Sequence, residues 1–489
     1  MDKSIKEYRQ WRHSRRAASR PIGFEVDERD LDPKLRDDQK AVVEWALNQG
    51  RSALFINTGG GKTFSGLEWS RIVAERTDKP VLVFAPLAVS DQIVREAVTK
   101  WGIGATYVRT QDEAMRAPTN IVVSNFELLD RFDTAAFGGV WIDESSIIKN
   151  AASKTRHLVN RMLATVPYRL MSTATPSPNE HDELGNHSQA LGIMPWHEMI
   201  TRWFIRDSAQ ADVLRLKHHA HKDFWKWVAS WAVCINKPSD IGFSDEGFNL
   251  PPLTVTHLEA QIDHTHAQAE MLRSGQFKLL ATEALSATEL WNNKRVTLMP
   301  RMELAAEFVA REPNEACVIW VETNDEADTL RAMLPDAIEV RGNESLDAKR
   351  AKLRAFSEGN ERLLITKLGI AGFGMNWQHC HRTVIASLTF SFESTYQGLK
   401  RFHRFGQAHP VEAALITAST ESNVLAAIKR KEAQFLEMQS QMNAAMRATG
   451  LLAKVNTFED YGYNPTKTIR LAPFIQPHSF TEINQPCRA

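Results

Sequence analysis

Residues 52–63 read Ser52-Ala-Leu-Phe-Ile-Asn-Thr-Gly-Gly-Gly-Lys-Thr63, so an apolar segment runs directly into a glycine-rich loop. Glycines let backbone N–H groups approach phosphate oxygens closely, and the N-terminus of a following helix favours negative charge. We therefore expect an ATP or GTP site, in which Lys62 faces the β/γ-phosphates and the Thr63 hydroxyl binds Mg²⁺. Because Ile56 stands at the first glycine position of the usual pattern, the loop alone leaves a chance turn as an alternative. The predicted phosphate-contacting residues are Thr58, Gly59, Gly60, Gly61, Lys62 and Thr63.

The composition limits the classes of protein to which the chain can belong. A chain of 489 residues with 43% hydrophobic and 24% charged residues is expected to be globular and to form several domains. It has no apolar run long enough to cross a membrane and begins with polar residues, so we expect no membrane partner and a cytoplasmic location, in the host cytoplasm if the chain is phage-encoded. The four cysteines lack C-x-x-C spacing, which argues against a zinc or disulfide framework.

The charge distribution is uneven although the formal net charge is zero. Residues 3–20 are rich in Lys and Arg, whereas 25–38 are acidic. The basic stretch is either an arm that contacts DNA or a protein, or a solvated terminus, and charge runs are commonly the latter.

Apolar segments alternate with helical patterns in two regions, which predicts two α/β lobes with parallel sheets. We expect a basic arm at 1–24, a first lobe at 25–195, a Trp-rich helical insertion or linker at 196–299, a second lobe at 300–420, and a long helix with a tail at 421–489. Predicted strands in the first lobe are 53–56, 81–85, 120–124, 140–142 and 168–171. Those in the second lobe are 317–321, 338–340, 363–365 and 383–385.

Two adjacent carboxylates, Asp143 and Glu144, follow the apolar segment 140–142. Ligands bind at the carboxyl ends of strands in α/β sheets, so we expect Asp143 to hold Mg²⁺ partly through water and Glu144 to polarise an attacking water. The alternative is that Asp143-Glu-Ser-Ser146 is an acidic cap that begins a helix. The upstream glycine loop favours the catalytic interpretation.

The segment Asp143-Glu-Ser-Ser-Ile-Ile-Lys-Asn150 resembles motif II of superfamily 2 helicases, the DEAD/DEAH-box proteins, in the form found in the SWI/SNF-like DNA translocase branch. The compact plan is similar to versions from bacteriophages and prophages. Ser146 departs from the family pattern, which usually has His or Asp there, and Ser391-Phe-Glu393 lacks the W-N-P that often precedes motif VI. Further segments match in the expected order: 35–39, 84–86, 172–176, 371–376 and 397–407.

The resemblance implies two RecA-like lobes that share ATP and Mg²⁺. It implies that Arg36 and Gln39 contact adenine, and that Gly372, Gly374 and Gln397 contribute to the nucleotide site. Four residues would couple the nucleotide to nucleic acid: Ser172, Thr173, Thr175 and Asn376. The motif VI residues Arg401 and Arg404 lie three apart, and we expect them to project from one helical face as arginine fingers toward the γ-phosphate.

Members of this branch hydrolyse ATP when DNA lies across both lobes, so the resemblance implies a DNA-stimulated ATP hydrolase, with duplex DNA favoured over single strands. Two alternatives stay open: a strand-separating DNA or RNA helicase, and a nucleotide-binding interaction protein that does not hydrolyse. The candidate contacts to DNA are the 3–20 arm and the basic stretch 202–226, and 196–255 is a candidate protein-binding region. Burial is favoured over base stacking for Trp225, Trp227 and Trp231, and packing between elements is favoured for Met438, Met442 and Met446.

Overall fold

The structure is a computed structural model that describes residues 21–150, 152–206, 214–246, 248, 250–261, 294–371 and 377–449. The chain divides into two compact units, and residues 19–455 form the unit that contains all of these. The other unit, residues 1–18 with 456–489, lies outside the described residues, as does the predicted basic stretch 3–20. The predicted motif V residues Gly372, Gly374 and Asn376 also lie outside them.

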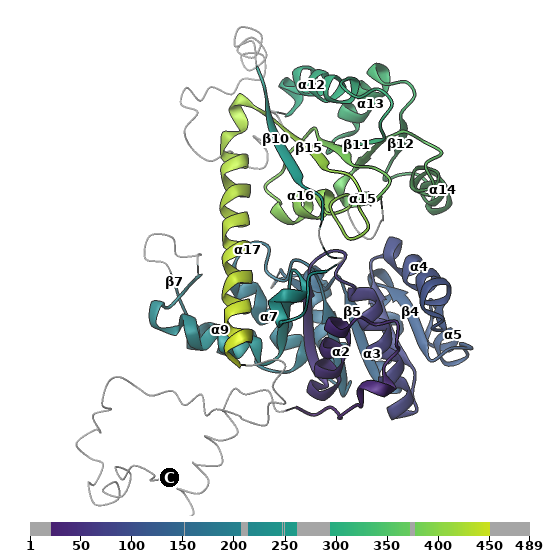
Figure 1. The fold of residues 1–489 in the computed structure, drawn as a ribbon, viewed down its shortest axis with the longest axis vertical. Coiled ribbons are helices and arrows are strands. Elements are labelled where there is room, and N and C mark those ends of the chain that lie inside the picture. The colour runs from purple at the N-terminus through teal and green to yellow at the C-terminus, as the bar shows by residue number, and fades with distance from the viewer. Residues whose placement is uncertain are drawn as a thin grey trace, which may run out of the picture. The chain divides into compact units, whose positions relative to one another are not determined.

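The first sheet has seven strands, and every pair of neighbours runs parallel. This confirms the α/β class, and the strands predicted for this region are all present. We call this sheet and the elements packed on it the first lobe (Figure 1). In spatial order the strands are β3 (Ala105–Tyr107), β4 (Ile121–Asn125), β2 (Val81–Ala85), β5 (Gly139–Asp143), β6 (Tyr168–Ser172), β1 (Arg51–Ile56) and β9 (Ala232–Ile235). Its helices include α2 (Asp37–Gln49), α3 (Lys62–Thr77), α4 (Leu87–Glu96), α5 (Gln111–Met115), α6 (Lys154–Leu163) and α7 (Leu184–Leu191).

Helix α3 lies directly on the sheet because Gly66 has no side chain at the crossing point. A Cβ atom added to Gly66 would stand 2.3 Å from the ring of Trp141 on β5. Trp69 of the same helix is fully buried, as is Trp141. This close packing fixes the N-terminus of α3, where Lys62 begins the helix.

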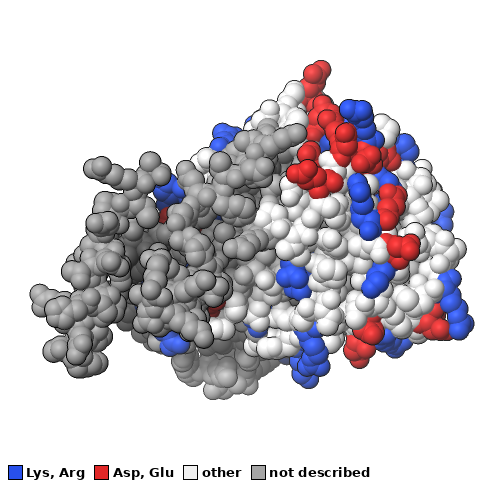
Figure 2. Space-filling view, turned by 90° about the horizontal axis from the view of Figure 1, so that it is seen from below, with Lys and Arg blue, Asp and Glu red and all other residues white. Residues whose placement is uncertain are grey.

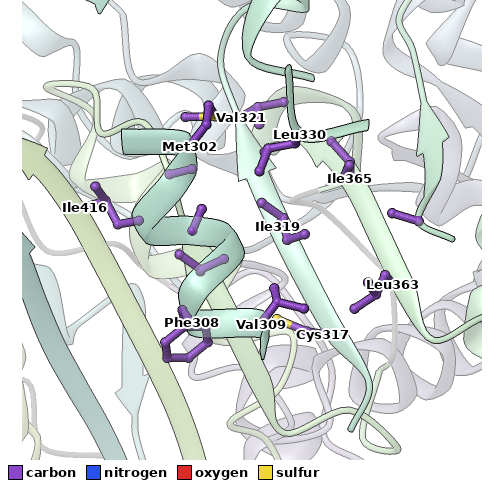
Figure 3. Packing of buried hydrophobic residues seen from close by; sticks show 14 of the residues in the cluster. Met302, Phe308, Val309, Cys317, Ile319, Val321, Leu330, Leu363, Ile365 and Ile416 are labelled. Carbon is purple, nitrogen blue, oxygen red and sulfur yellow. The ribbon is translucent and has the colours of Figure 1, made fainter. Parts of the chain in front are cut away.

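The second sheet has six strands, which are also all parallel. With its helices it forms the second lobe. Its core lies between the sheet and α12 (Leu298–Ala310), where Met302 and Phe308 pack toward Ile319 and Ile416 (Figure 3). In spatial order the strands are β10 (Leu253–Ala260), β15 (Val411–Ala418), β14 (Arg382–Ile385), β11 (Cys317–Val321), β13 (Leu363–Lys367) and β12 (Ile338–Val340). The other helices are α13 (Asn324–Met333), α14 (Leu346–Ser357), α15 (Leu368–Ala371) and α16 (Phe392–Leu399).

The segment 196–299, expected to be a helical insertion, contains strands of both sheets. Helices α8 (Trp196–Trp203) and α9 (His221–Ala229) are present, and a small antiparallel hairpin of β7 (Phe204–Arg206) and β8 (Leu214–Leu216) lies between them. Strand β9 follows α9 and pairs with β1, whereas β10 pairs with β15 of the second sheet. The structure therefore places 232–235 in the first lobe and 253–260 in the second. Trp225, Trp227 and Trp231 are buried, as predicted.

Helix α17 (Ser422–Thr449) packs against elements of both lobes. Near its middle Phe435 contacts Phe392 and Tyr396 of α16, with ring centroids 5.5 and 5.3 Å apart. Its later part packs against α9 and β9 of the first lobe. There the Met446 sulfur lies 3.1 Å from the backbone nitrogen of Cys234. The predicted packing role of the methionines is confirmed, because Met438, Met442 and Met446 are all buried.

Two compositional features have structural counterparts. Among the described residues, no helix combines the length and the apolar character needed to span a bilayer.

The cysteines Cys234, Cys317 and Cys380 are buried free thiols, and burial raises the pKa of the Cys380 thiol to about 12.

A buried ion pair joins three elements of the second lobe. Arg301 of α12 lies 2.8 Å from the Glu326 carboxylate of α13, and both side chains are almost fully buried. The Arg301 guanidinium also donates to the Ala386 carbonyl oxygen, just after β14, at 2.8 Å. The Glu326 carboxylate in turn accepts from the backbone N–H of Thr323 at 3.0 Å, at the start of α13. Despite the opposing effect of burial, the Arg301 charge and these backbone bonds lower the pKa of Glu326.

Replacing one partner of this pair is expected to destabilise the second lobe strongly. In Arg301→Met the Glu326 carboxylate stays buried without its cation, a change that costs about 3–5 kcal/mol. Urea unfolding followed by tryptophan fluorescence measures the change. The control is Arg311→Met, which removes an exposed pair with Glu307 and is expected to cost at most about 1 kcal/mol. Equal shifts in the two variants would contradict this account.

Candidate nucleotide site

The candidate site lies where β5, β6 and β1 end, because these strands are neighbours in the first sheet. The pairing register places Asp143 of β5 beside Ser172 of β6, and Ser172 beside Leu54 of β1. Parallel strands present their carboxyl ends at one edge, so the acidic pair, the loop after β6 and the glycine loop emerge together. Residues that are distant in sequence thereby meet at one place.

The glycine loop turns directly into α3, and Gly61 is the residue that caps this helix. Gly59 and Gly61 have φ angles of 82° and 96°, a region that favours glycine. At the end of the loop the Lys62 ammonium donates to the carbonyl oxygen of Ile56 at 2.8 Å. Ile56, which stands at the usual first glycine position, thus contributes its backbone oxygen to the fold of the loop.

Arg36 and Gln39, predicted to contact adenine, both lie against the glycine loop. The Arg36 guanidinium and the Gln39 amide donate to the carbonyl oxygen of Gly60 at 3.3 and 3.4 Å. The fit is close, since a Cβ atom added to Gly61 would stand 1.9 Å from the Gln39 amide nitrogen. The start of α2 and the glycine loop therefore form one packed unit.

The acidic pair is buried at the end of β5. Asp143 accepts a hydrogen bond of 2.7 Å from the Ser172 hydroxyl, which itself accepts one of 2.8 Å from the Trp141 indole. Burial, followed by the negative charge of Glu144, raises the pKa of Asp143 to about 6, although the Ser172 bond and the Lys62 charge oppose this. A buried carboxyl with a raised pKa is a suitable place for a cation.

Glu144 does not act as an ordinary helix cap. Its backbone has φ 52°, which is unusual for a residue with a side chain, and its carboxylate makes no cap bond to the short helix Ser145–Ile148 that follows. Instead the carboxylate accepts a hydrogen bond of 3.3 Å from Thr173, in the loop after β6. Glu144 thus stands at the N-cap position of the short helix, but its side chain bonds to the loop after β6 and not to the helix start.

Arg401 and Arg404 come from the second lobe and share the electrostatic environment of the glycine loop and acidic pair. Burial lowers the pKa of Lys62 most, and the two arginine charges lower it further, whereas Glu144 and Asp143 raise it. The negative charge of Glu144 likewise raises the pKa of both arginines, against the larger effect of burial. The structure thus brings the five predicted catalytic residues together.

One expectation about the arginines is wrong. Helix α16 ends at Leu399, and Arg401 and Arg404 lie in successive turns beyond it, so they do not project from a helical face. Between them Phe402 is fully buried, with its ring centroid 5.9 Å from that of Trp377. The buried Phe402 ring thus anchors the turn that carries both arginines in the second lobe.

A chain of hydrogen bonds joins the acidic pair to motif VI through the predicted coupling residues. Thr173, which donates to Glu144, accepts from the backbone N–H of Thr175 at 3.1 Å. The Thr175 hydroxyl accepts from the Gln397 amide at 3.3 Å, and the Gln397 oxygen accepts from Arg401 at 3.0 Å. Every side chain in this chain is buried. Ser172, as described above, joins it through Asp143.

Several residues at the site were not predicted from the sequence. Tyr396 donates from its hydroxyl to the Asn57 side chain at 2.8 Å, and the same Asn57 oxygen accepts from the backbone N–H of Thr58 at 2.8 Å. Asn57 precedes the glycine loop directly, and Tyr396 precedes the predicted Gln397 directly. Their positions next to predicted site residues could have drawn attention to Asn57 and Tyr396. Neither residue type by itself, however, indicates a contact between the lobes.

Two phenylalanines at the site also come from distant segments. A Cβ atom added to Gly59 would stand 2.8 Å from the backbone nitrogen of Phe405. The Phe405 ring stacks on Phe248 with centroids 5.6 Å apart, and the Arg36 guanidinium lies 5.3 Å from the Phe248 centroid. An arginine and two aromatic rings therefore stack beside the glycine loop.

The oxygen ligands present suit a Mg²⁺ ion that is shared with a phosphate chain. Asp143, Glu144 and the Thr63 hydroxyl offer oxygens only, and Mg²⁺ in such sites uses one or two carboxylates together with phosphate oxygens and water. Within the described part of the chain, no three His, Cys, Asp or Glu side chains gather as a complete protein cage. A shared ion therefore fits these residues.

Comparison with protein-family models and with curated proteins gives no match for this chain.

Substitution of Gly61 is expected to loosen the junction between the loop and α2. Gly61→Ala adds a Cβ where the Gln39 amide lies, in addition to the backbone cost of a positive φ, which is about 1–2 kcal/mol. The matched control is Gly102→Ala, with φ 71° and nothing within 4 Å of the added atom. We expect Gly61→Ala to lower the melting temperature more than Gly102→Ala and to speed amide hydrogen exchange in α2. Equal effects would contradict the packing account.

Proposed function

We propose that the chain is a DNA-stimulated ATP hydrolase, a motor with two RecA-like lobes similar to superfamily 2 helicases of the SWI/SNF-like branch. One observation carries the proposal: the glycine loop before Lys62 lies against the turn of Arg404, since a Cβ atom added to Gly59 would stand 3.5 Å from the Arg404 Cβ. Hydrogen bonds also connect Glu144, beside Asp143, to Arg401 of the second lobe. Such a combination of cations and carboxylates is what transfer of a phosphoryl group to water requires.

The roles of the residues follow from their chemistry. The loop N–H groups and Lys62 bind the β- and γ-phosphates, while Glu144 orients the attacking water and accepts its proton. Asp143, with Thr63, would hold Mg²⁺, which neutralises phosphate charge when bound. Arg401 and Arg404 stabilise the negative charge that develops on the γ-phosphate oxygens.

Motion would follow from the position of the substrate between contacts from both lobes. ATP bound to the loop and to the arginines would favour the arrangement in which all of these contacts form, and hydrolysis would remove that preference. The hydrogen-bonded path from Glu144 through Thr173, Thr175 and Gln397 to Arg401 gives the two lobes a direct connection at the reacting group.

The nucleic-acid surface is less defined than the nucleotide site. Figure 2 shows Lys and Arg side chains interspersed with Asp and Glu on the described part of one face. A mixed face of this kind makes no uniform basic track there. Duplex DNA is therefore proposed from the resemblance of the motifs and not from a surface patch.

Hydrolysis is expected to depend on Lys62 and Glu144. Lys62→Ala removes the cation that holds the phosphates, and Glu144→Gln keeps an oxygen for Thr173 but removes the base. We expect each to lower kcat for ATP hydrolysis at saturating DNA by at least about 10²-fold. Only Lys62→Ala should also weaken ATP binding, measured by isothermal titration. The exposed controls Lys79→Ala and Glu44→Gln should leave both quantities near the wild-type values; DNA-stimulated hydrolysis that survives in both site variants would refute the proposal.

The choice of nucleic acid is tested by comparing ATP hydrolysis with duplex DNA, single-stranded DNA and RNA. We expect the largest stimulation with duplex DNA, together with displacement of the third strand from a triplex and no separation of the duplex. Strand separation would support the helicase alternative, and stimulation by RNA alone would overturn DNA as the substrate. The absence of hydrolysis with any of them, in protein that binds ATP, would favour the non-hydrolysing alternative.

A further inference from the structure

Glu393 is a buried carboxylate of the second lobe whose two partners both belong to the first. It lies in the first turn of α16 and only 5% of its side chain is exposed. One carboxylate oxygen accepts a hydrogen bond of 3.0 Å from the Thr175 hydroxyl, and the other forms an ion pair with the Lys149 ammonium. A glutamate in the first turn of a helix ordinarily faces its own N-terminus or water. Here the side chain connects two lobes instead.

The two partners are held firmly in the first lobe. Thr175 is fully buried in the loop after β6. Lys149 follows the short helix after the acidic pair, and its carbonyl oxygen accepts a hydrogen bond of 2.6 Å from the Asn186 amide of α7. Burial lowers the pKa of Lys149, the charge of Lys431 on α17 lowers it further, and the charge of Glu183 opposes this. Glu393 therefore meets a preformed pair of donors.

Thr175 makes Glu393 part of the path to the reacting groups. Its hydroxyl donates to Glu393 while it accepts from Gln397, one turn further along α16, and Gln397 accepts from Arg401. A hydroxyl has one hydrogen to donate, so the bond to Glu393 fixes its rotation and leaves its lone pairs facing Gln397. The position of Glu393 thus influences Gln397 and, through it, Arg401.

A buried carboxylate is costly unless it is paired, and separation of the lobes would remove both partners of Glu393 at once. We propose that Glu393 is a positioning residue, which by binding Thr175 and Lys149 holds the second lobe where Arg401 acts on the γ-phosphate. The inference rests on the proposed ATP hydrolysis for its kinetic consequence, whereas its structural part stands without it. In the sequence, Glu393 stands out only because Ser391-Phe-Glu393 lacks the W-N-P pattern.

The test uses the full-length chain and two readouts. The first is kcat and KM for ATP at saturating duplex DNA. The second is energy transfer between dyes attached through Lys79→Cys in the first lobe and Asn360→Cys in the second, with Cys487→Ser to remove a competing thiol. Both labelled positions are exposed, and the remaining cysteines are buried. Energy transfer needs no hydrolysis.

We expect Glu393→Ala to lower kcat by about 10²-fold, the effect of misplacing a catalytic group by about 1 Å, while KM changes by less than about threefold. Its energy transfer with a non-hydrolysable ATP analogue should differ from that of the wild type. In Glu393→Gln, which keeps the acceptor for Thr175, the loss in kcat should be smaller. The matched control is Arg350→Met, which removes a different cross-lobe ion pair, the exposed one with Asp91. It should change kcat at saturating DNA by less than about fivefold.

The double substitution Glu393→Gln/Lys149→Met guards against misfolding, since it leaves no unpaired buried charge. Its loss in kcat should be clearly smaller than the product of the losses in the single variants. Wild-type energy transfer in Glu393→Ala, or independent effects in the double variant, would overturn the inference. If the wild type binds ATP but hydrolyses none under any condition, the proposed function fails, and the energy transfer of the variants still decides whether Glu393 positions the lobes.

Discussion

Two adjacent carboxylates, Asp143 and Glu144, are buried at the end of one strand, and this constraint organises the site. Buried negative charges need hydrogen-bond donors and cations around them. The neighbouring strand β6 supplies donors through Ser172 and Thr173, because its register sets them beside β5. The cations come from the glycine loop and from the second lobe. The folded chain thus supplies hydrogen-bond donors and cations that the segment around Asp143 and Glu144 does not itself contain.

Much of the fold could be predicted because buried parallel strands are continuous apolar runs, as in β2 and β11. In the two parallel sheets four strands were missed, β3, β9, β10 and β15, although β9 and β15 are largely buried as well. β10 reads Leu253-Thr-Val-Thr-His-Leu-Glu-Ala260 and is mostly exposed at the sheet edge, so it has no apolar run. β9 is only four residues long and follows a helical, Trp-rich segment, which led to its assignment to an insertion. Both are defined by pairing with distant strands, which local sequence does not record.

The residues of the candidate site also fall into two groups, those that the sequence predicted and those that it did not. Lys62, Asp143, Arg401 and their neighbours in motifs were predicted because their residue types and spacing carry chemistry. Glu393, Tyr396 and Phe248 were not, since each acts through a contact that exists only once distant segments have folded together. The turn that carries Arg401 was mistaken for helix because three-residue spacing suits both. Burial of Phe402, a tertiary effect, decided between them.

Helix α17 adds a mechanical consequence. A helix of 28 residues is a rod of about 42 Å, and this one is continuous with the last strand of the second sheet while it packs on α9 and β9 of the first. Any change in the distance between the lobes must therefore be absorbed by sliding at one of its contacts. The buried side chains in the second half of the helix include Met438, Met442 and Met446, and Met446 contacts β9. Their unbranched thioethers can repack at low cost. The second half of the helix can therefore adjust its packing on the first lobe, while the aromatic contacts of Phe435 hold the helix near its middle.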